Sequence, residues 1–235
     1  MTDHIVKAYD LEITSLRNML AEMAGIAEEQ LSKAVRALST RDLKLADEVI
    51  GNDELLDELE REIGEKAILT IAKRQPMASD LREIMVAIRI AADIERIGDL
   101  AKNTAKRTHA ISETLPRRLA SGLTRMGSLA MAEFTQVFDA YARRDDKAAM
   151  EVWRSDGELD ALYNSIFREL LTYMMEDPRN IGSCTHLLFG SKNLERIGDH
   201  ATNIAENVHY LVHGKTMREN RPKQDVTSMM DAQEK

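Results

Sequence analysis

The pentapeptide Glu-Arg-Ile-Gly-Asp occurs twice in this chain of 235 residues. The first copy lies within DIERIGDLAKN (93–103) and the second within NLERIGDHATN (193–203). A further stretch is repeated, because NDELLDELEREI (52–63) can be aligned with SDGELDALYNSI (155–166). Such self-similarity indicates a duplicated structural unit, so the chain is expected to fold as two similar halves.

Each half has the pattern of three amphipathic helices, in which apolar residues recur every three to four positions. Pro76 and Pro178 mark matching breaks before the third and sixth helices, and Gly214 is expected to end the last one. Aromatic residues make up only 4% of the chain, a usage typical of long helices. The predicted helices cover residues 6–38, 43–72, 78–112, 118–142, 147–175 and 180–212.

The sequence therefore predicts an all-α fold of two tandem, similar three-helix bundles, with six long antiparallel helices produced by an internal duplication. The first bundle is expected at residues 1–112 and the second at residues 113–215. Residues 216–235 are polar and are expected to form a disordered tail.

The overall composition excludes several classes of protein. A net charge of −8 argues against a nucleic-acid partner, which would require a basic face. The single cysteine, Cys184, cannot form an intramolecular disulfide and fits a reducing compartment. The N-terminal residues lack a signal-peptide pattern, and the most apolar run, 84–94, contains Arg89 and is too short to span a bilayer. We expect a soluble, cytoplasmic protein with at most peripheral membrane association.

Acidic residues four positions apart recur in matching places of both halves. At about 100° per residue, Glu95 and Asp99 fall on one side of a helix, opposite Ile94 and Ile97. The preceding helix carries a similar acidic pair, and a short loop would make the two helices neighbours. The candidate metal ligands are Asp53, Asp57, Glu95, Asp99 and Asn103 in the first half and Asp156, Asp160, Glu195, Asp199 and Asn203 in the second.

Like charges at this spacing destabilise a helix by a few tenths of a kcal/mol, so their repetition indicates a bound cation. Oxygen ligands suit Mg or Mn, and Fe and Zn also accept carboxylates; the identity of the divalent or trivalent ion stays open. The alternative is a solvated acidic face, in which Arg96 and Arg196 neutralise the carboxylates. Identity at matching positions of two divergent halves favours the metal.

Other residues in the repeated helices carry weaker signals. Gly98 and Gly198 cost helix stability, so their retention indicates close approach of a neighbouring helix. His109 and His209 lie near helix ends, where a C-terminal cation is favourable, and Glu206 forms a Glu-x-x-His pair with His209. Whether these three join the metal sites stays open.

Three stretches carry a family resemblance. RQPMASDLREI (74–84), AADIERIGDLAKN (91–103) and NLERIGDHATNIAENVHYLVHGK (193–215) resemble the PhoU family, regulators of phosphate uptake and phosphate signalling in bacteria. The resemblance covers about residues 5–215. It implies two three-helix bundles whose acidic motifs hold metal ions on the bundle surface.

The resemblance also implies a function. Members act as adaptors between the ATPase subunit of the phosphate ABC transporter (PstB type) and the phosphate-responsive sensor histidine kinase (PhoR type), and they repress signalling when phosphate is plentiful. Homodimers are expected. Asn193 and Glu206 replace the Asp93 and Lys106 of the first half, so the two metal sites are expected to differ in charge and affinity.

The leading hypothesis is a non-enzymatic, metal-binding regulatory adaptor. The alternative is a carboxylate-bridged dimetal enzyme, which would need the Glu-x-x-His motif on two helices, whereas the chain has it once at 206–209. A structural helical scaffold without metal is a third hypothesis.

Overall fold

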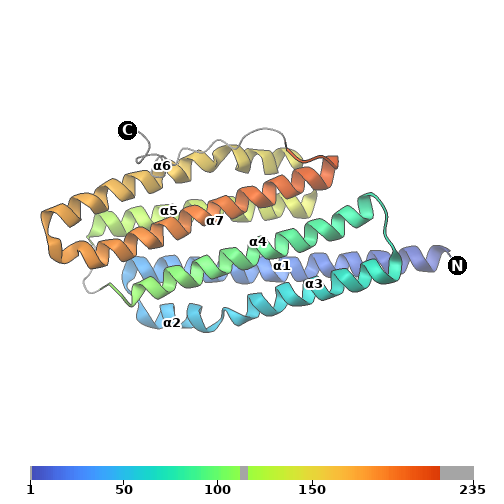
Figure 1. Ribbon diagram of the computed structural model, residues 1–235, viewed down its shortest axis with the longest axis horizontal. Helices are drawn as coiled ribbons and strands as arrows, with labels where there is room; N and C mark the ends of the chain where they lie inside the picture. The colour runs from blue at the N-terminus through green and yellow to red at the C-terminus, as the bar shows by residue number, and fades with distance from the viewer. Residues whose placement is uncertain (1, 112–115, 218–235) are drawn as a thin grey trace, which may run out of the picture.

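The computed structural model describes residues 2–111 and 116–217, with side chains from Tyr9 onward. These residues are helical apart from short connections, which confirms the predicted all-α fold of two similar helical halves. Consecutive long helices run antiparallel along one common direction (Figure 1). The elements are α1 (Thr2–Thr40), α2 (Leu43–Gly51), α3 (Glu54–Arg74), α4 (Ser79–Thr108), α5 (Arg117–Arg143), α6 (Asp146–Glu176), the 3-10 helix η1 (Pro178–Asn180) and α7 (Ile181–His213).

The helix boundaries follow local capping chemistry. The carboxylate of Asp42 accepts a hydrogen bond from the Leu45 amide at the start of α2, and Asp145 does the same for Ala148 at the start of α6. Gly214 adopts a φ of 69° directly after α7, as predicted for the residue that ends this helix. The fourth helix ends at Thr108, earlier than the predicted residue 112.

The predicted helix over residues 43–72 is wrong in one respect, because a turn at Asn52 and Asp53 divides it into α2 and α3. The side-chain amide of Gln30 in α1 donates a hydrogen bond of 3.0 Å to the carbonyl oxygen of Asn52. The same oxygen also accepts a hydrogen bond from the amide of Leu55 at 3.4 Å. A side chain that bonds to a helix carbonyl is a known cause of helix interruption. The matching helix of the second half, α6, is continuous.

The two halves share one contiguous apolar core. Within the first half, α1, α3 and α4 pack on one another, and within the second half α5, α6 and α7 do so. Contacts between the halves run from α1 to α5 and from α4 to α7, which lie side by side in Figure 1. A Cβ atom on Gly127 of α5 would lie 2.5 Å from both γ carbons of Val35 in α1, so this contact requires glycine.

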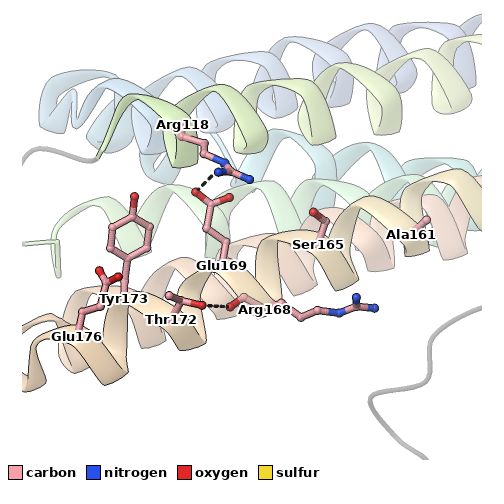
Figure 2. A pocket seen from close by; sticks show the side chains of 8 residues that line it. All are labelled: Arg118, Ala161, Ser165, Arg168, Glu169, Thr172, Tyr173 and Glu176. Atoms are coloured by element: carbon pink, nitrogen blue, oxygen red, sulfur yellow. Dashed lines mark hydrogen bonds and ion pairs between the residues drawn. The ribbon is translucent and has the colours of Figure 1, made fainter.

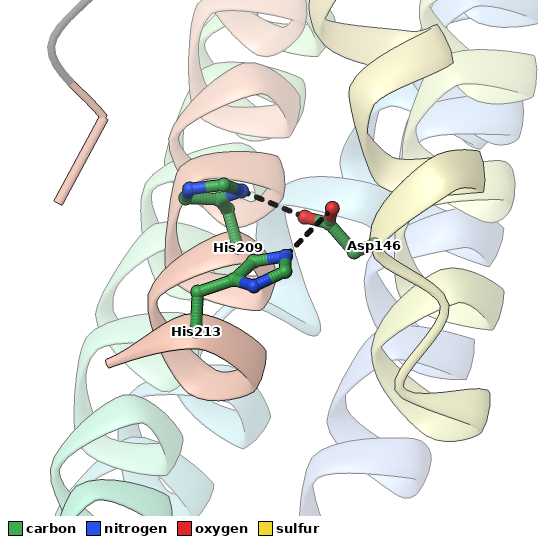
Figure 3. A group of neighbouring side chains, drawn as sticks. All are labelled: Asp146, His209 and His213. Atoms are coloured by element: carbon green, nitrogen blue, oxygen red, sulfur yellow. Dashed lines mark hydrogen bonds and ion pairs between the residues drawn. The ribbon is translucent and has the colours of Figure 1, made fainter. Parts of the chain in front are cut away.

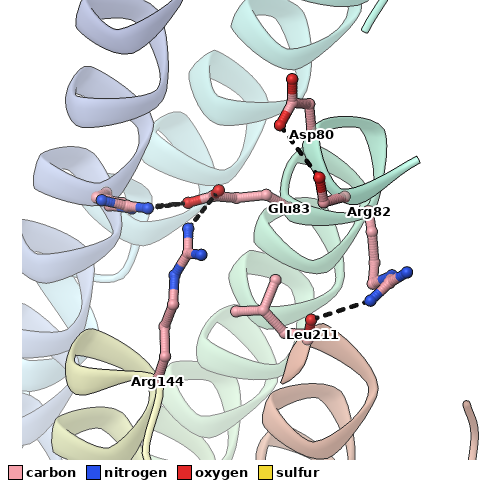
Figure 4. Close-up of polar contacts among 7 residues, drawn as sticks. Asp80, Arg82, Glu83, Arg144 and Leu211 are labelled. Atoms are coloured by element: carbon pink, nitrogen blue, oxygen red, sulfur yellow. Dashed lines mark hydrogen bonds and ion pairs between the residues drawn. The ribbon is translucent and has the colours of Figure 1, made fainter. Parts of the chain in front are cut away.

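Ion pairs also join the halves at one end of the molecule (Figure 4). Glu83 of α4 accepts hydrogen bonds from Arg17 of α1, at 2.7 Å from Nε, and from Arg144 in the turn between α5 and α6, at 2.5 Å. Arg82 donates a hydrogen bond of 3.3 Å to the carbonyl oxygen of Leu211, near the end of α7. The N-terminus of α4 is thereby fixed to the second half.

The proposed domain boundary at residues 112 and 113 stays a prediction, because residues 112–115 lie outside the described part of the chain. The predicted disordered tail falls almost entirely within residues 218–235, which are likewise not described.

Candidate metal centres

In the first half, four predicted ligands lie close together where α3 packs against α4, and we call them the first acidic cluster: Asp53, Asp57, Glu95 and Asp99. Asp53 is buried, with only 5% of its surface exposed. Lys102 of α4 forms an ion pair with Asp53 and lies 3.8 Å from an oxygen of Asp99. An internal cation therefore already compensates part of the negative charge of this cluster.

Burial and, after it, charge repulsion raise pKa values in the first acidic cluster. Partial burial raises the pKa of Asp57, and the negative charges of Asp53 and Asp99 raise it further. Burial also raises the pKa of Glu95, followed by the charge of Asp99, while Arg96 opposes the shift. Both environments disfavour the ionised carboxylate, and a bound cation would favour it.

In the second half, the corresponding ligands lie between α6 and α7, and we call them the second acidic cluster: Asp156, Asp160, Glu195 and Asp199. Three of them are buried, with exposed fractions of 2% for Asp156 and 3% for Asp160 and Glu195. These carboxylates are thus more buried than expected from the family resemblance, and the location of metal ions at the bundle surface stays a prediction.

Glu195 shows the strongest perturbation of the second acidic cluster. Burial raises the pKa of Glu195 to about 6, although Lys192 lies 2.9 Å from its Oε1 and opposes the shift. Its other oxygen, Oε2, is buried and accepts no hydrogen bond from any described residue. A buried carboxylate oxygen without a donor fits a metal ligand, because coordination would satisfy it.

The structure adds a residue that was missed from the sequence, Glu133 of α5. Its side chain is buried, and its Oε2 lies 3.1 Å from the position that a Cβ on Gly198 would occupy. The same Cβ would lie 3.5 Å from an oxygen of Asp156 and only 2.5 Å from Leu159. Glu133 therefore adds a fifth carboxylate to the second acidic cluster, and the predicted close approach at Gly198 is confirmed.

The first half has the same arrangement with a neutral residue. A Cβ on Gly98 would lie 2.2 Å from a methyl group of Leu56 and 3.4 Å from Oε1 of Gln30. When Asp53 is aligned with Asp156, Gln30 matches Glu133. Extending the repeat alignment into the first helix of each half would have identified this pair.

The sequence predicts the acidic residues on the helix face opposite the apolar one. In α3 the two faces are closer together, because Leu55 is half exposed and Leu56 is buried. The buried face of α3 therefore passes through Asp53, Leu56 and Ile63, so Asp53 belongs to it. Packing of α3 against α1 and α4 decides this rotation, because a wheel gives only relative angles.

Other candidates are exposed or make separate contacts. Asn103 is exposed. Asn203 donates a hydrogen bond of 3.3 Å to Asp93, which joins α7 to α4 between the halves. Glu206 accepts a hydrogen bond from the indole of Trp153. Among the described residues, no side-chain hydrogen bond joins Asn103, Asn203 or Glu206 to the acidic clusters.

The histidines near the helix ends also form separate contacts. In the first half, His109 Nε2 lies 2.9 Å from a carboxylate oxygen of Asp47. In the second half, Asp146, His209 and His213 converge (Figure 3), and we call them the His-Asp triad. Their potential ligand atoms all lie within 4.8 Å of one another, so this group can hold a metal ion by its geometry.

A surface hollow of about 500 Å³ lies between the start of α5 and the second half of α6 (Figure 2). It is open to solvent, and Arg118 extends from α5 toward Glu169 of α6, at 3.4 Å. Arg168 and Glu176 also line it, so its charges are mixed. The hollow does not include a residue of either acidic cluster, and we assign it no role.

Comparison with known proteins decides the family. The PhoU domain matches this chain twice, at residues 20–108 and 123–208. The chain belongs to the PhoU family. The two matched segments coincide with the two helical halves, so the internal repeat is a repeat of the PhoU domain.

Named relatives cover nearly the whole chain. A phosphate-specific transport system accessory protein PhoU homolog from Rhizobium meliloti is 57% identical over 228 residues, which is 97% of this chain and 96% of the relative. The phosphate-specific transport system accessory protein PhoU of Escherichia coli is 38% identical over 218 residues, which is 93% of this chain and 90% of the relative.

Solved PhoU structures show the same fold. The crystal structure of PhoU from Pseudomonas aeruginosa has a TM-score of 0.82 at 39% identity, covering 88% of this chain and all of that one. The crystal structure of the phosphate transport system regulatory protein PhoU from Streptococcus pneumoniae has a TM-score of 0.83 at 26% identity. It covers 90% of this chain and 100% of that chain.

PhoU proteins are accessory regulatory proteins and not a family of enzymes, which sets aside the dimetal-enzyme alternative. None of the helices within residues 2–111 and 116–217 combines the length and apolar character needed to cross a bilayer.

Proposed function

We propose that this chain is a regulatory adaptor that negatively regulates phosphate uptake and phosphate-regulon signalling, by linking the ATPase subunit of a phosphate ABC transporter to a phosphate-responsive histidine kinase. Near-complete coverage of relatives named phosphate-specific transport system accessory proteins supports this role. The adaptor carries metal ions in its two acidic clusters, acts in the cytoplasm and forms a homodimer.

The observation that carries the metal part is the buried Glu195 oxygen that no described donor satisfies. Glu133, Asp156 and Asp160 bring further buried carboxylates to the same place. Oxygen ligands in this number suit a hard or borderline cation such as Mg, Mn, Fe or Zn. The second acidic cluster should bind metal more tightly than the first, because it has the additional carboxylate of Glu133 where the first half has the neutral side chain of Gln30.

A protein partner is supported by exposed apolar side chains in α3 and in the loop that follows it. Ile68 and Leu69 of α3 are more than half exposed, and Met77, in the loop after α3, is 81% exposed. Neighbouring exposed apolar residues often mark an interaction site. We assign contacts with the transporter ATPase or the kinase to this surface.

Metal analysis tests the first part of the proposal. Protein purified without chelator should contain metal, and the variant Glu95→Ala, Asp99→Ala, Glu195→Ala, Asp199→Ala should lose most of it. The matched control replaces Glu58 and Glu62, an exposed acidic pair with the same spacing on α3. Equal metal content in wild type and the four-fold variant would overturn the metal assignment.

The regulatory role is tested in cells. Deletion of the gene should raise expression from a phosphate-regulated promoter in high phosphate, and the wild-type chain should restore repression. Co-purification with the transporter ATPase or the histidine kinase should be lost in an Ile68→Asp, Leu69→Asp variant. Normal repression in the deletion strain would contradict the proposed function.

A further inference from the structure

The His-Asp triad joins the start of one helix to the end of another. Asp146 is the first residue of α6, and His209 and His213 lie one turn apart in the last turns of α7. One carboxylate oxygen of Asp146 lies 2.8 Å from Nδ1 of His209, and the other lies 2.9 Å from Nε2 of His213. Both imidazoles thus face the same carboxylate (Figure 3).

The two imidazoles are arranged as neighbouring ligands. Their ring centroids are 4.6 Å apart, with 42° between the ring planes. Histidines four residues apart on one helix face are a common way to bind zinc, since both nitrogens can reach one ion. His213 is about half exposed, so water can reach a further coordination position.

The triad is not part of the duplicated PhoU pattern. With the halves aligned on their acidic motifs, the first half has Leu43, His109 and Glu113 at the positions of Asp146, His209 and His213. His109 pairs there with a different carboxylate, that of Asp47. The second half therefore has a two-histidine group that the repeat did not supply.

We propose that Asp146, His209 and His213 form a separate metal site that takes a first-row transition-metal dication of the Zn²⁺ class. This goes beyond the proposed function, which places metal only in the acidic clusters. Two imidazole nitrogens and one carboxylate favour Zn²⁺, Co²⁺ or Ni²⁺ over Mg²⁺ and Ca²⁺, which prefer oxygen ligands only.

The side chains must adjust to bind an ion. Metal–ligand distances of about 2.0 to 2.2 Å in a tetrahedral site place ligand atoms about 3.4 Å apart. The two nitrogen–oxygen distances, to different oxygens of Asp146, are 2.8 and 2.9 Å, so these pairs must separate by about half an ångström. Ligand atoms that lie as far as 4.8 Å apart must instead approach one another. All three side chains lie at helix termini near the surface, where rotation can provide this change. The bound ion would link α6 directly to α7.

The test uses the full-length protein, stripped of metal with a chelator and titrated with Co²⁺. Coordination by imidazole in a site of low coordination number gives a visible absorption band, which an all-oxygen site gives only weakly. Wild type and the Glu95→Ala, Asp99→Ala, Glu195→Ala, Asp199→Ala variant should both show this band. Zn²⁺ should displace Co²⁺ and raise Tm, since only the folded chain brings the ligands together.

Substitution separates the triad from the acidic clusters. The double variant His209→Asn, His213→Asn and the single variant Asp146→Asn should each lower the Co²⁺ affinity of this site at least 10-fold. Circular dichroism should confirm that both variants remain folded. His109→Asn is the matched control and should leave the band unchanged. The proposal would be overturned if the absorption band were unchanged in the double variant His209→Asn, His213→Asn. It would also be overturned if the wild-type protein showed no band. Loss of the band only in the four-fold carboxylate variant would place the ion in the acidic clusters and also overturn it.

Discussion

The ammonium group of Lys102 forms an ion pair with the buried carboxylate of Asp53, whereas the matching position in the second half holds Thr202. The hydroxyl of Thr202 donates to the backbone carbonyl of Asp199 and brings no charge. In the second acidic cluster the nearby cation is instead Lys192, which lies 2.9 Å from Oε1 of Glu195. The two clusters therefore pair their internal lysine with different carboxylates, although their acidic motifs are identical in spacing.

Replacing Lys102 by Thr, the residue at the matching position of the second half, should remove the cation that pairs with Asp53. The metal-free protein should lose about 1 to 3 kcal/mol of unfolding free energy, because Asp53 is left buried without its partner. Mn²⁺ affinity of the first acidic cluster should rise. Urea unfolding in chelator and Mn²⁺ calorimetry measure the two effects. Lys106→Thr, an exposed lysine one turn later, is the control and should change neither.

The unfolding free energy should depend on pH through the ionisation of Glu195. Burial raises the pKa of this carboxyl from 4.5 to about 6 in the folded chain. The folded state then binds more protons than the unfolded state between these values. Its stabilising contribution is fully present below pH 4.5 and is lost as pH rises through 6.

A Glu195→Gln variant should lack this loss, because its side chain stays neutral. In metal-free protein, the variant should gain about 1 to 2 kcal/mol relative to wild type between pH 4.5 and about pH 7.5. Urea unfolding at several pH values in chelator measures the difference. A difference between the two proteins that does not change with pH would contradict the burial of an ionisable Glu195.

Gly127→Ala should destabilise the fold, although alanine favours helices. The added methyl would lie 2.5 Å from both γ carbons of Val35, whose β-branched side chain has little rotational freedom. The expected loss is about 1 to 3 kcal/mol. Gly25→Ala in α1, where nothing lies within 4 Å, should instead gain up to about 1 kcal/mol. Thermal unfolding compares both variants with wild type.

Glu83→Gln should weaken the connection between the halves. The substitution removes the negative charge that strengthens the hydrogen bonds from Arg17 and Arg144. We therefore expect a decrease of about 1 to 2 kcal/mol in unfolding free energy. Glu58→Gln, which affects an exposed pair with Arg61, should change stability by less than about 0.5 kcal/mol. If both variants behave alike, the Glu83 network does not hold the halves together.

Local sequence information was sufficient for the helices and the repeat. Most helix ends were predicted correctly from helix periodicity, Pro76, Pro178 and Gly214. These signals act on neighbours within a few residues, so the sequence alone reveals them. The turn that separates α2 from α3 was missed, because it depends on Gln30, more than twenty residues earlier in the chain.

The sequence by itself determined that two acidic motifs would each lie on one helix face, since residues four apart always share a face. Only the tertiary structure decided which carboxylates are buried, that Glu133 joins the second acidic cluster and that Lys102 neutralises Asp53. It also decided that Asp146 meets His209 and His213. These contacts join helices that are distant in sequence, and their rotation and depth are set by packing of side chains across the whole core.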